Sequence, residues 1–539
     1  MKLLSVYPGH NAAVCILDDG EVVLNLELER HNRVRHSGGF DEAFVAHCLA
    51  RAGLSIDDID RVCINRGSGG ELRAHGVPDT ASVLSRSGLE FELLGRRVSA
   101  TVVNHHVAHL ASAFYTSPFE DAAVFSLDGG GDDANTGLAV GRGDKLDVAE
   151  LQVTAPPVAR WWAYLCRNNY RMAEATPWEI GNGAGKLMAL AAYGRRDDAV
   201  LRQLRTDMRV YNRKSTNRAD KSNYVFNRAE DLSDVTGRRA QDVAWSLQHF
   251  TEDIVTDALF DMLARTELPD LCYAGGVALN CIATAHAMTD LPFRRVHVPP
   301  CPNDCGLALG MALYTWHQVM KRPRRPTLFS PYTGPIYAAR EIDRALEAAR
   351  AAGFMFDVTP IDARGLAETL AAGHIVCHWR GRSECGPRAL GHRSILCRPD
   401  LPGIRERMNV IKDREWYRPF APIIRAERAA DVLETVLDHS AYMTTSAVVR
   451  APWRERLAGI CHVDHTTRPQ VLGRDMEPFL HEMLTIYEDL CGLPAVLNTS
   501  FNLKEPIVET PAEAVATFRR MDIDRLVLDD RLIVKRPAD

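Results

Sequence analysis

The sequence predicts an α/β protein of more than one domain, whose N-terminal part contains two related halves. Short apolar strands alternate with amphipathic helices over most of its 539 residues. Two strand-turn-strand units of one plan lie within residues 3–27 and 122–141, each with a glycine-containing turn. A chain of this length, 46% hydrophobic and 25% charged, can bury two or more cores.

The two hairpin units favour one α/β architecture. The first has strands at residues 3–7, 12–17 and 21–27, and the second has strands at 122–127 and 137–141 around three successive glycines. This is the pattern of an actin-like fold, in which two glycine-rich hairpins hold phosphates between two related halves.

The later segments predict the domain boundary. The polar stretch 201–239 is expected to be an irregular insertion over the site, and helical periodicity returns at 240–265. Residues 321–334, rich in proline and arginine, are expected to begin a linker, so we place the domains at 1–340 and 341–539. Further helices are expected at 306–313, 338–352, 363–372 and 477–490, and further strands at 271–274, 375–378 and 495–502.

Composition excludes several classes of protein. A net charge of -6 argues against bulk nucleic-acid binding, although local basic clusters could still hold phosphates. Thirteen scattered cysteines without CxxC pairs indicate a reducing interior, with Cys301 and Cys305 as core residues. The first strand follows Met1 almost directly, without a secretory signal, and no apolar run approaches a membrane span, so we expect a cytoplasmic protein.

Residues 104–133 combine three histidines, an apolar strand and an acidic, glycine-rich turn. Asn104 can cap a helix on which His105 and His109 lie four residues apart and face the same way. The following strand delivers Asp128 into the turn. Two imidazoles and a carboxylate suit a divalent Fe, Mn or Zn ion. The simpler alternatives are partly buried, hydrogen-bonded histidines and an ordinary hairpin turn.

Two residues far away in the chain strengthen the metal hypothesis. Asp304 lies in a proline-constrained loop before a helix, and His10 lies in the turn of the first hairpin. Together with the residues above they would supply two histidines and two carboxylates, with one further imidazole left for proton transfer.

Two glycine-containing stretches are candidates for nucleotide contacts. The run GNGAGK, which ends at Lys186, lacks both the spacing and the following Ser or Thr of a P-loop, so we reject that interpretation and keep Lys186 as a candidate. The turn that contains Gly275, Gly276 and Asn280 joins a strand to a helix and can approach a nucleotide closely.

An arginine-rich region follows residue 380. Between Arg380 and Arg425 there are ten arginines and Lys412. Such runs are usually solvated faces, but here Ala389-Leu390, Ile395-Leu396 and the aromatic-proline run WYRPFAPII place the charges among core-forming residues. Buried cations need anions, so this region predicts phosphate binding.

These motifs, in chain order, resemble the antibiotic O-carbamoyltransferases, the family that includes the tobramycin and cephalosporin carbamoyltransferases and a nodulation protein of related sequence. The resemblance runs along the chain through PGH, NHHVAHLASAF, SLDGGGD, GKLMALAAYG, YAGGVALN, PNDCGLALG, ECGPRALGHRSI, NVIKDREWYRPFAPI and LNTSFN. Their order and coverage make the resemblance specific.

The resemblance implies an N-terminal domain similar to TsaD, the threonylcarbamoyl-transfer protein of tRNA modification, with an actin-like (ASKHA) fold over 1–340. It implies a YrdC-like α/β domain over 341–539. The YrdC-like domain would make carbamoyladenylate from carbamoyl phosphate and ATP, with Mg²⁺ accompanying ATP. The TsaD-like domain would then transfer the carbamoyl group to a hydroxyl of a natural product, an antibiotic or sugar scaffold, and release AMP.

The resemblance also implies roles for individual residues. His105, His109, Asp128 and Asp304 match metal ligands, with Fe²⁺ as the implied metal, and His10 matches the base for the acceptor hydroxyl. Nucleotide-binding positions are matched by Lys186, Gly275, Gly276 and Asn280. The candidates for carbamoyl phosphate and ATP are Arg388, Arg393, Lys412, Arg414, Arg418, Arg468, Asn498, Ser500 and Asn502.

The sequence departs from the common family pattern at several positions. The first turn reads PGHNAA instead of GHDGA, and the lysine loop reads AGKLMALAAYG instead of EGKVMGLAPYG. His392 and His465 stand in GHRS and HVDHTTRPQ, where GNRS and HVDGTARVQ are commoner. The implied metal and base positions are all retained.

Three other functions compete with the carbamoyltransferase hypothesis. A tRNA threonylcarbamoyl-adenosine synthase has the same two domain types, but the negative net charge disfavours an RNA partner. An actin-like small-molecule kinase would release ADP instead of AMP and pyrophosphate. The third alternative is a nucleotide-gated binding protein of the heat-shock type, but that function would not explain the arginine-rich domain. Acceptor specificity is expected in the loops 67–77 and 201–239.

Overall fold

The structure is a computed structural model and describes residues 1–66, 72, 77, 83–132, 134–152, 158–172, 183–214, 230–435 and 440–536. It divides into two compact units, and the chain passes between them repeatedly. The first unit contains Met1–Glu21, His36–Glu42 and Ile56–Phe329. The second contains Val22–Arg35, Ala43–Ser55 and Ser330–Asp539. Two N-terminal segments therefore belong to the same unit as the C-terminal part of the chain.

The first sheet of the first unit begins with the predicted N-terminal hairpin. Strand β1 (Lys2–Tyr7) pairs antiparallel with β2 (Ala13–Asp18) and parallel with β4 (Arg61–Ile64). Strand β6 (Arg96–Val103) runs parallel to β4, and β5 (Ser85–Leu93) pairs antiparallel with β6 at the edge. Nearly every residue of β1 and β2 is buried, as their apolar sequences require.

The second sheet repeats this topology. Strand β7 (Asp121–Gly131) pairs antiparallel with β8 (Ala134–Arg142) and parallel with β10 (Asp270–Ala274), while β10 runs parallel to β11 (Arg295–His297). Strand β9 (Lys145–Gln152) extends the sheet beyond β8. In both sheets a hairpin is followed by two parallel strands, so the expected two related halves of an actin-like α/β fold are confirmed.

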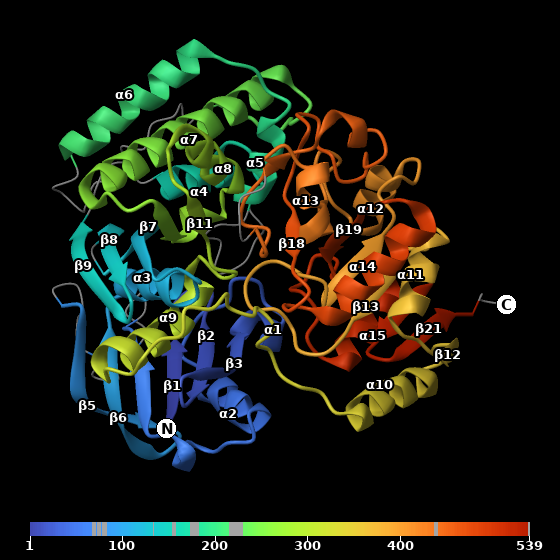
Figure 1. The fold of residues 1–539 in the computed structure, drawn as a ribbon, viewed down its shortest axis with the longest axis horizontal. Coiled ribbons are helices and arrows are strands. Elements are labelled where there is room, and N and C mark those ends of the chain that lie inside the picture. The colour runs from blue at the N-terminus through green and yellow to red at the C-terminus, as the bar shows by residue number, and fades with distance from the viewer. Residues whose placement is uncertain are drawn as a thin grey trace. The chain divides into compact units, whose positions relative to one another are not determined.

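Two helices pack together between these sheets (Figure 1). Helix α3 (His105–Tyr115) is buried along its whole length, and α9 (Leu307–Tyr314) lies against it and against β1. Their backbones approach so closely that a Cβ atom on Gly310 would lie 1.9 Å from the carbonyl oxygen of Ala108. Only a glycine at this position permits that separation.

One helix of the first unit contradicts a prediction. Helix α6 (Asp198–Lys214) occupies the start of the stretch 201–239, which we expected to be irregular, so the prediction is wrong there. Leu201 and Leu204 are buried at helical spacing, and α6 packs on α7 (Arg238–Thr266), which is enough to hold an otherwise polar helix. Residues 215–229 of that stretch, and most of 67–77, lie outside the described residues.

The remaining helical elements of the first unit are short. They are η1 (Ile56–Asp58), α4 (Val158–Asn168), α5 (Ala184–Ala191), η4 (Gly276–Leu279), α8 (Cys281–Asp290), η5 (Asp304–Gly306) and η6 (Thr315–Val319).

The second unit is built on an eight-stranded sheet with the order β12-β21-β20-β13-β14-β19-β15-β18. Its strands are β12 (Phe356–Pro360), β13 (Val376–Trp379), β14 (Arg393–Cys397), β15 (Ala421–Arg425), β18 (Gln470–Leu472), β19 (Ala495–Ser500), β20 (Arg525–Leu528) and β21 (Arg531–Lys535). A small pair, β16 (Ala447–Val448) and β17 (Thr466–Thr467), stands apart from it.

Helices enclose the apolar core of the second unit, in which α11 packs against α14. They are α10 (Ala339–Ala351), α11 (Ala363–Ala371), α12 (Ile404–Ile411), α13 (Ala426–Val432), η7 (Ala451–Trp453), α14 (Pro478–Cys491) and α15 (Pro511–Arg520). The two N-terminal segments contribute β3 (Glu21–Glu27), α1 (Leu28–Asn32) and α2 (Glu42–Arg51).

Two further observations concern cysteines and membranes. All thirteen cysteines are free thiols, and Cys301 and Cys305 are buried as expected of core residues. Of the helices in the described part of the chain, none is both long enough and apolar enough to cross a bilayer.

Replacing Gly310 with alanine should lower the free energy of unfolding by about 1–3 kcal/mol, the usual cost of forcing extra atoms into a packed core. The new methyl group would overlap the carbonyl oxygen of Ala108, so α9 would have to move away from α3. Denaturant unfolding measures the difference. Gly473→Ala is the control, because its added carbon meets no atom within 4 Å; equal losses in both variants would contradict the explanation.

Candidate functional site

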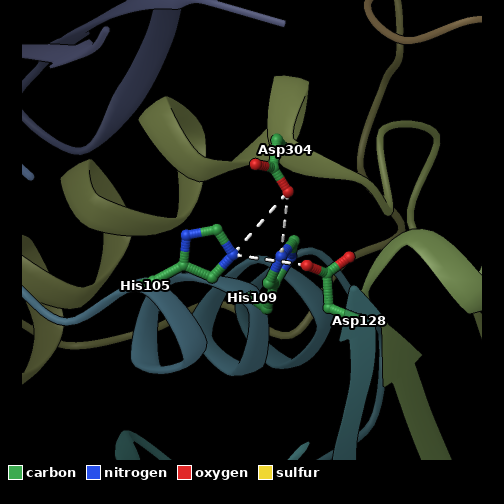
Figure 2. A group of neighbouring side chains, drawn as sticks. All are labelled: His105, His109, Asp128 and Asp304. Atoms are coloured by element: carbon green, nitrogen blue, oxygen red, sulfur yellow. Dashed lines mark ion pairs between the residues drawn. The ribbon is translucent and has the colours of Figure 1, made fainter. Parts of the chain in front are cut away.

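Four side chains of the first unit converge on one point (Figure 2). They are His105 and His109 from α3, Asp128 from β7 and Asp304 from η5. One ligand atom from each lies within 4.8 Å of all the others, and all four side chains are buried. The structure thus brings together residues that are up to about 200 positions apart in the chain, and they form a possible metal-binding cluster.

Local structure fixes the two histidines. The side chain of Asn104 caps α3 by accepting hydrogen bonds from the backbone N–H groups of His106 and Val107, at 2.9 and 3.3 Å. The helix therefore begins at His105, and its periodicity places His109 one turn later on the same face. A Cβ atom on Gly131 would lie 2.4 Å from Cγ of His105, so this glycine makes room for the imidazole.

Hydrogen bonds also fix the two carboxylates. Asp128 accepts backbone N–H groups, Oδ1 from Gly276 at 2.7 Å and Oδ2 from Gly130 at 3.1 Å. Asp304 Oδ2 accepts the hydroxyl of Tyr7 at 2.7 Å, which leaves Oδ1 facing the imidazoles. The aspartates are thus oriented before any ion binds.

The imidazole nitrogens face the carboxylates across short gaps. His105 Nε2 lies 3.6 Å from Asp128 Oδ2 and 3.7 Å from Asp304 Oδ1, and His109 Nε2 lies 3.5 Å from Asp304 Oδ1. None of the ring nitrogens of these two histidines has a hydrogen-bond partner among the described residues, although all are buried. Buried polar atoms without partners are costly, and a divalent cation between two nitrogens and two oxygens would satisfy them.

The electrostatics of the cluster follow from burial and proximity. Burial alone would lower the pKa of His105, but Asp304 and Asp128 raise it to about 9. Burial acts against ionisation of Asp304, yet His10 and His105 lower its pKa to about 2. The pKa of Asp128 lies well below its usual value for the same reason. The site therefore holds two ionised carboxylates.

The third histidine of the motif does not join the cluster. His106 Nδ1 lies 3.1 Å from the Ser126 hydroxyl, on another face of α3. Burial and the neighbouring His105 and His109 lower its pKa to about 3. A neutral, hydrogen-bonded His106 fits the simpler interpretation that applies to most buried histidines.

His10 stands beside the cluster. Its Nε2 lies 3.4 Å from Asp304 Oδ2, and its side chain is 17% exposed, in contrast to the fully buried imidazoles of α3. Its buried Nδ1 has no hydrogen-bond partner among the residues described. The position suits a proton acceptor at the edge of the cluster, and that role stays a prediction.

The predicted nucleotide turn is joined to the cluster through Asp128. Gly275 has a φ of +94°, and a Cβ atom there would lie 2.2 Å from the Leu127 carbonyl oxygen, so glycine is required. Gly276 donates to Asp128, as described above. Asn280 caps α8 and exchanges two hydrogen bonds with the amide of Gln248, at 2.9 and 3.1 Å.

Lys186 lies in the first turn of α5 and is partly exposed. Gly183 precedes this helix with a φ of +94°. The neighbouring residues 181–182 of the glycine-rich run lie outside the described part. The roles of Lys186 and Asn280 in nucleotide binding stay predictions.

A second group of charged residues lies in the second unit, where most of the arginines singled out from the sequence meet. We call Arg388, Lys412, Arg414, Arg418 and Arg468 the cation cluster. Lys412 is only 2% exposed. Burial and the nearby Arg414 and Arg418 lower the pKa of Lys412 well below its usual value.

The other cations of the cluster are similarly crowded. Burial lowers the pKa of Arg414 well below its usual range, and Arg418, Arg468 and Arg388 add to the effect. One carboxylate, Glu415, lies 3.4 Å from Arg418 Nη1. This concentration of one buried and several partly buried positive charges favours a multiply charged anion such as a phosphate ester.

The predicted polar residues around β19 are bonded to this cluster. Lys412 Nζ donates to the carbonyl oxygens of Ser500 and Asn502 at 2.5 and 2.8 Å, and to Asn502 Oδ1 at 2.9 Å. The Ser500 hydroxyl donates to the same Oδ1 at 2.7 Å. Lys412, Ser500 and Asn502 therefore form one hydrogen-bonded group.

Two predicted residues contact the protein backbone. Arg393 is fully buried, and its guanidinium donates to the carbonyl oxygens of Arg380 and Gly381 at 2.9 and 3.0 Å. Asn498 donates to the carbonyl oxygen of Ala389 at 3.0 Å, next to Arg388. These contacts orient the loop before β14, and ligand contacts by Arg393 and Asn498 stay predictions.

Two residues near these groups were not predicted from the sequence. Tyr7, at the end of β1, holds Asp304, and the only available signal was its place directly before the His10 turn. Arg35, from the N-terminal segment of the second unit, acts on the cation cluster by lowering the pKa values of Lys412 and Arg418. No local pattern links Arg35 to residues nearly 400 positions later.

Two family models match this chain. One family model, described as the carbamoyltransferase N-terminus, matches residues 2–74 and 92–313, and another, the carbamoyltransferase C-terminus, matches residues 367–535. The chain belongs to the carbamoyltransferase family. It is therefore an enzyme, a carbamoyltransferase, as the sequence resemblance indicated.

Relatives match this carbamoyltransferase over nearly its whole length. The nodulation protein NolNO of Sinorhizobium fredii is 33% identical, with 98% of this chain and 79% of that protein covered. Nodulation protein U of the same species is 29% identical, with 93% and 94% covered. An uncharacterized protein of Synechocystis sp. is 31% identical, with 98% and 95% covered.

Among solved structures, HypF of T. kodakarensis matches 61% of this carbamoyltransferase and 49% of its own chain, with 12% identity and a TM-score of 0.34. A dehydratase component A of Acidaminococcus fermentans matches 58% and 97%, with 15% identity and a TM-score of 0.34. Likeness at this level does not bear on the activity.

His109→Ala should weaken binding of a divalent metal by more than about 100-fold, because even the outer partners of metal ligands contribute up to that factor. Metal content after dialysis, measured by inductively coupled plasma mass spectrometry, reports the loss. His106→Gln is the matched control, since His106 lies on the same helix but faces Ser126. Full metal occupancy in His109→Ala, or equal loss in the two variants, would contradict the assignment.

Proposed function

We propose that this carbamoyltransferase is an ATP-dependent O-carbamoyltransferase with two reaction steps. It forms carbamoyladenylate from carbamoyl phosphate and ATP, and then transfers the carbamoyl group to a hydroxyl of a natural product, an antibiotic or sugar scaffold. The main support is the pairing of two different charged sites in one chain: a histidine–aspartate cluster in the first unit and the cation cluster in the second.

In the first step, the cation cluster would bind the phosphates of carbamoyl phosphate and of ATP with Mg²⁺. Water takes up the phosphoryl group of carbamoyl phosphate and leaves carbamate, and a carbamate oxygen then bonds to the α-phosphorus of ATP as pyrophosphate leaves. Negative charge therefore gathers on the oxygen atoms of the two leaving groups. Lys412, which is buried, and Arg414 and Arg418, which are partly buried, would stabilise that charge more strongly than cations in water. Arg388 and Arg468 would complete the set.

In the second step, the first unit would hold carbamoyladenylate and the acceptor. When bound by His105, His109, Asp128 and Asp304, a divalent ion such as Fe²⁺ supplies Lewis-acid polarisation of a carbonyl oxygen. Lys186, Gly275, Gly276 and Asn280 would bind the nucleotide part. The hydrogen bond from the Gly276 N–H to Asp128 would fix the nucleotide-binding turn relative to the four metal-binding residues.

His10 would remove the proton of the acceptor hydroxyl. Its Nε2 faces Asp304 Oδ2 at 3.4 Å, and its side chain is 17% exposed, whereas those of His105 and His109 are fully buried. An acceptor hydroxyl would therefore reach this imidazole more readily than the imidazoles of α3. The oxygen then bonds to the carbamoyl carbon, and the bond from that carbon to the AMP oxygen breaks.

The product assay tests this proposal. The protein, loaded with Fe²⁺, is incubated with ATP, Mg²⁺, carbamoyl phosphate and a panel of hydroxylated metabolites, and products are identified by mass spectrometry. AMP, pyrophosphate and a carbamoylated metabolite are expected. ADP formation that depends on the acceptor, without AMP, would instead indicate a kinase, and transfer only to tRNA would indicate a threonylcarbamoyl-adenosine synthase.

His10→Asn should slow carbamoyl transfer by on the order of 10²–10⁴, the usual contribution of a general base. Carbamoyladenylate formation should stay near the wild-type rate, because His10 belongs to the first unit and the cation cluster to the second. Pyrophosphate release and transfer from supplied carbamoyladenylate are measured separately. Equal losses in both steps would count against the role of His10.

Arg418→Ala should do the reverse, slowing carbamoyladenylate formation by on the order of 10²–10³, as loss of one preorganised contact to developing charge does. Transfer from supplied carbamoyladenylate should remain close to wild type. Arg405→Ala is the matched control, because Arg405 is 29% exposed and pairs with a nearby glutamate, as the 28% exposed Arg418 does. If both variants behave alike, Arg418 has no special role.

A further inference from the structure

We propose that the N-terminal segment from Glu27 to Arg35 is a positioning element of the cation cluster. The segment belongs to the second unit and contacts two loops there, one that carries Arg388 and one that carries Asn502. The proposal rests on the proposed function for the identity of the bound phosphate. It goes further by assigning residues near the start of the chain to the site formed by its C-terminal part.

The first loop is held by a buried ion pair. Glu27 is 5% exposed and Arg30 is 1% exposed, and their Oε2 and Nε atoms lie 3.4 Å apart. Glu27 Oε1 accepts the Gly386 N–H at 2.5 Å, and Arg30 Nη2 donates to the Gly386 carbonyl oxygen at 3.1 Å. Both polar backbone groups of Gly386 are thus bound by the pair, two residues before Arg388.

The same loop is closed from within by Glu384. Its Oε1 accepts three backbone N–H groups, those of Leu390 and His392 at 2.7 Å and that of Arg393 at 3.1 Å. Arg30 Nη2 also donates to the Glu384 carbonyl oxygen at 3.3 Å. Arg388 therefore stands between two fixed ends, and one of these ends is held by residues from the start of the chain.

The second loop is held by Arg33 and Arg35. Arg33 Nη1 donates to the carbonyl oxygen of Ile507 at 2.7 Å, and Nη2 donates to that of Pro506 at 2.5 Å. Arg35 Nη2 approaches the Glu505 carbonyl oxygen at 3.4 Å. Three successive carbonyl groups are thus contacted by two arginines.

This second contact leads directly to Lys412. The Glu505 carbonyl oxygen also accepts the side-chain amide of Asn502 at 2.6 Å, and Asn502 Oδ1 accepts Lys412 Nζ at 2.9 Å. A continuous hydrogen-bonded path therefore runs from the N-terminal segment to the centre of the cation cluster. If the 505–507 loop loosens, Asn502 and Lys412 lose their fixed positions, and a phosphate should bind less tightly.

Arg33 is the residue to change, because its side chain is 23% exposed and its loss should be tolerated by the fold. Arg33→Ala should raise the KM for carbamoyl phosphate in pyrophosphate release about tenfold, as loss of one or two hydrogen bonds to a site does. The kcat of that step should change little. Transfer from supplied carbamoyladenylate should not change. Calorimetric titration with carbamoyl phosphate alone should show the same weakening.

Two further variants separate positioning from general stability. Arg454 is 32% exposed, donates to the Val449 carbonyl oxygen at 2.9 Å and pairs with Glu434 at 3.2 Å, so Arg454→Ala removes similar contacts elsewhere in the second unit. Its KM should equal that of wild type. Arg33→Lys retains one donor and should give an intermediate KM.

The KM values of these variants decide whether Arg33 has a positioning role. A KM for Arg33→Ala equal to that of Arg454→Ala, or an equal loss in both reaction steps, overturns the positioning role. If wild-type protein neither binds carbamoyl phosphate nor releases pyrophosphate, the proposed function fails instead. Should Arg33→Ala not fold, a wild-type KM in Arg33→Lys would overturn the proposal and a raised KM would support it.

Discussion

The close contact between α3 and α9 is the constraint on which the first site depends. His105 and His109 come from one helix, and Asp304 comes from the short turn before the other. Their side chains are short, so the three can meet only if the helix backbones nearly touch. Gly310 permits this separation because it places no side chain against Ala108. Packing of two apolar helices thus decides where a polar cluster can form.

The two sites are opposite in charge, and in each the charged groups are not fully neutralised by their neighbours. The first unit buries ionised carboxylates beside imidazoles that have no hydrogen-bond partner among the described residues. The second holds one buried and several partly buried cations, with few of the described carboxylates nearby. Each arrangement costs folding free energy, because buried charges lose their hydration. Proteins usually retain such strain where a ligand relieves it. A cation suits the first site and phosphates suit the second.

The sequence was most informative where short-range rules apply. The capped helix that starts at His105, the strand before Asp128 and the repeated hairpins all follow from local periodicity and capping. The predicted irregular stretch was wrong at α6, where two buried leucines stabilise a helix of otherwise polar composition. Its proline-constrained loop made Asp304 a candidate ligand, but local rules could not show that this loop meets His105 and His109, and the family resemblance was the second reason to include it.

Long-range pairing explains the other omissions. Nothing in the local sequence around Glu27 and Arg30 indicates that their partners are Glu384 and Gly386, because that contact depends on the completed fold. The same holds for Arg35 and the cation cluster. Local patterns predict elements and candidate residues, whereas the assignment of residues 22–35 to the second unit required the three-dimensional structure.

The passage of the chain between units has a consequence for its synthesis. The buried hydrogen bond from Arg30 to the Glu384 carbonyl oxygen can form only after Glu384, 354 residues later, has been synthesised. At typical rates of translation this delay is on the order of 20–70 s. During that time the ribosome displays an N-terminal segment whose charged and apolar side chains lack their partners. The enzyme therefore needs its last third before its first fifty residues can make all of their native contacts.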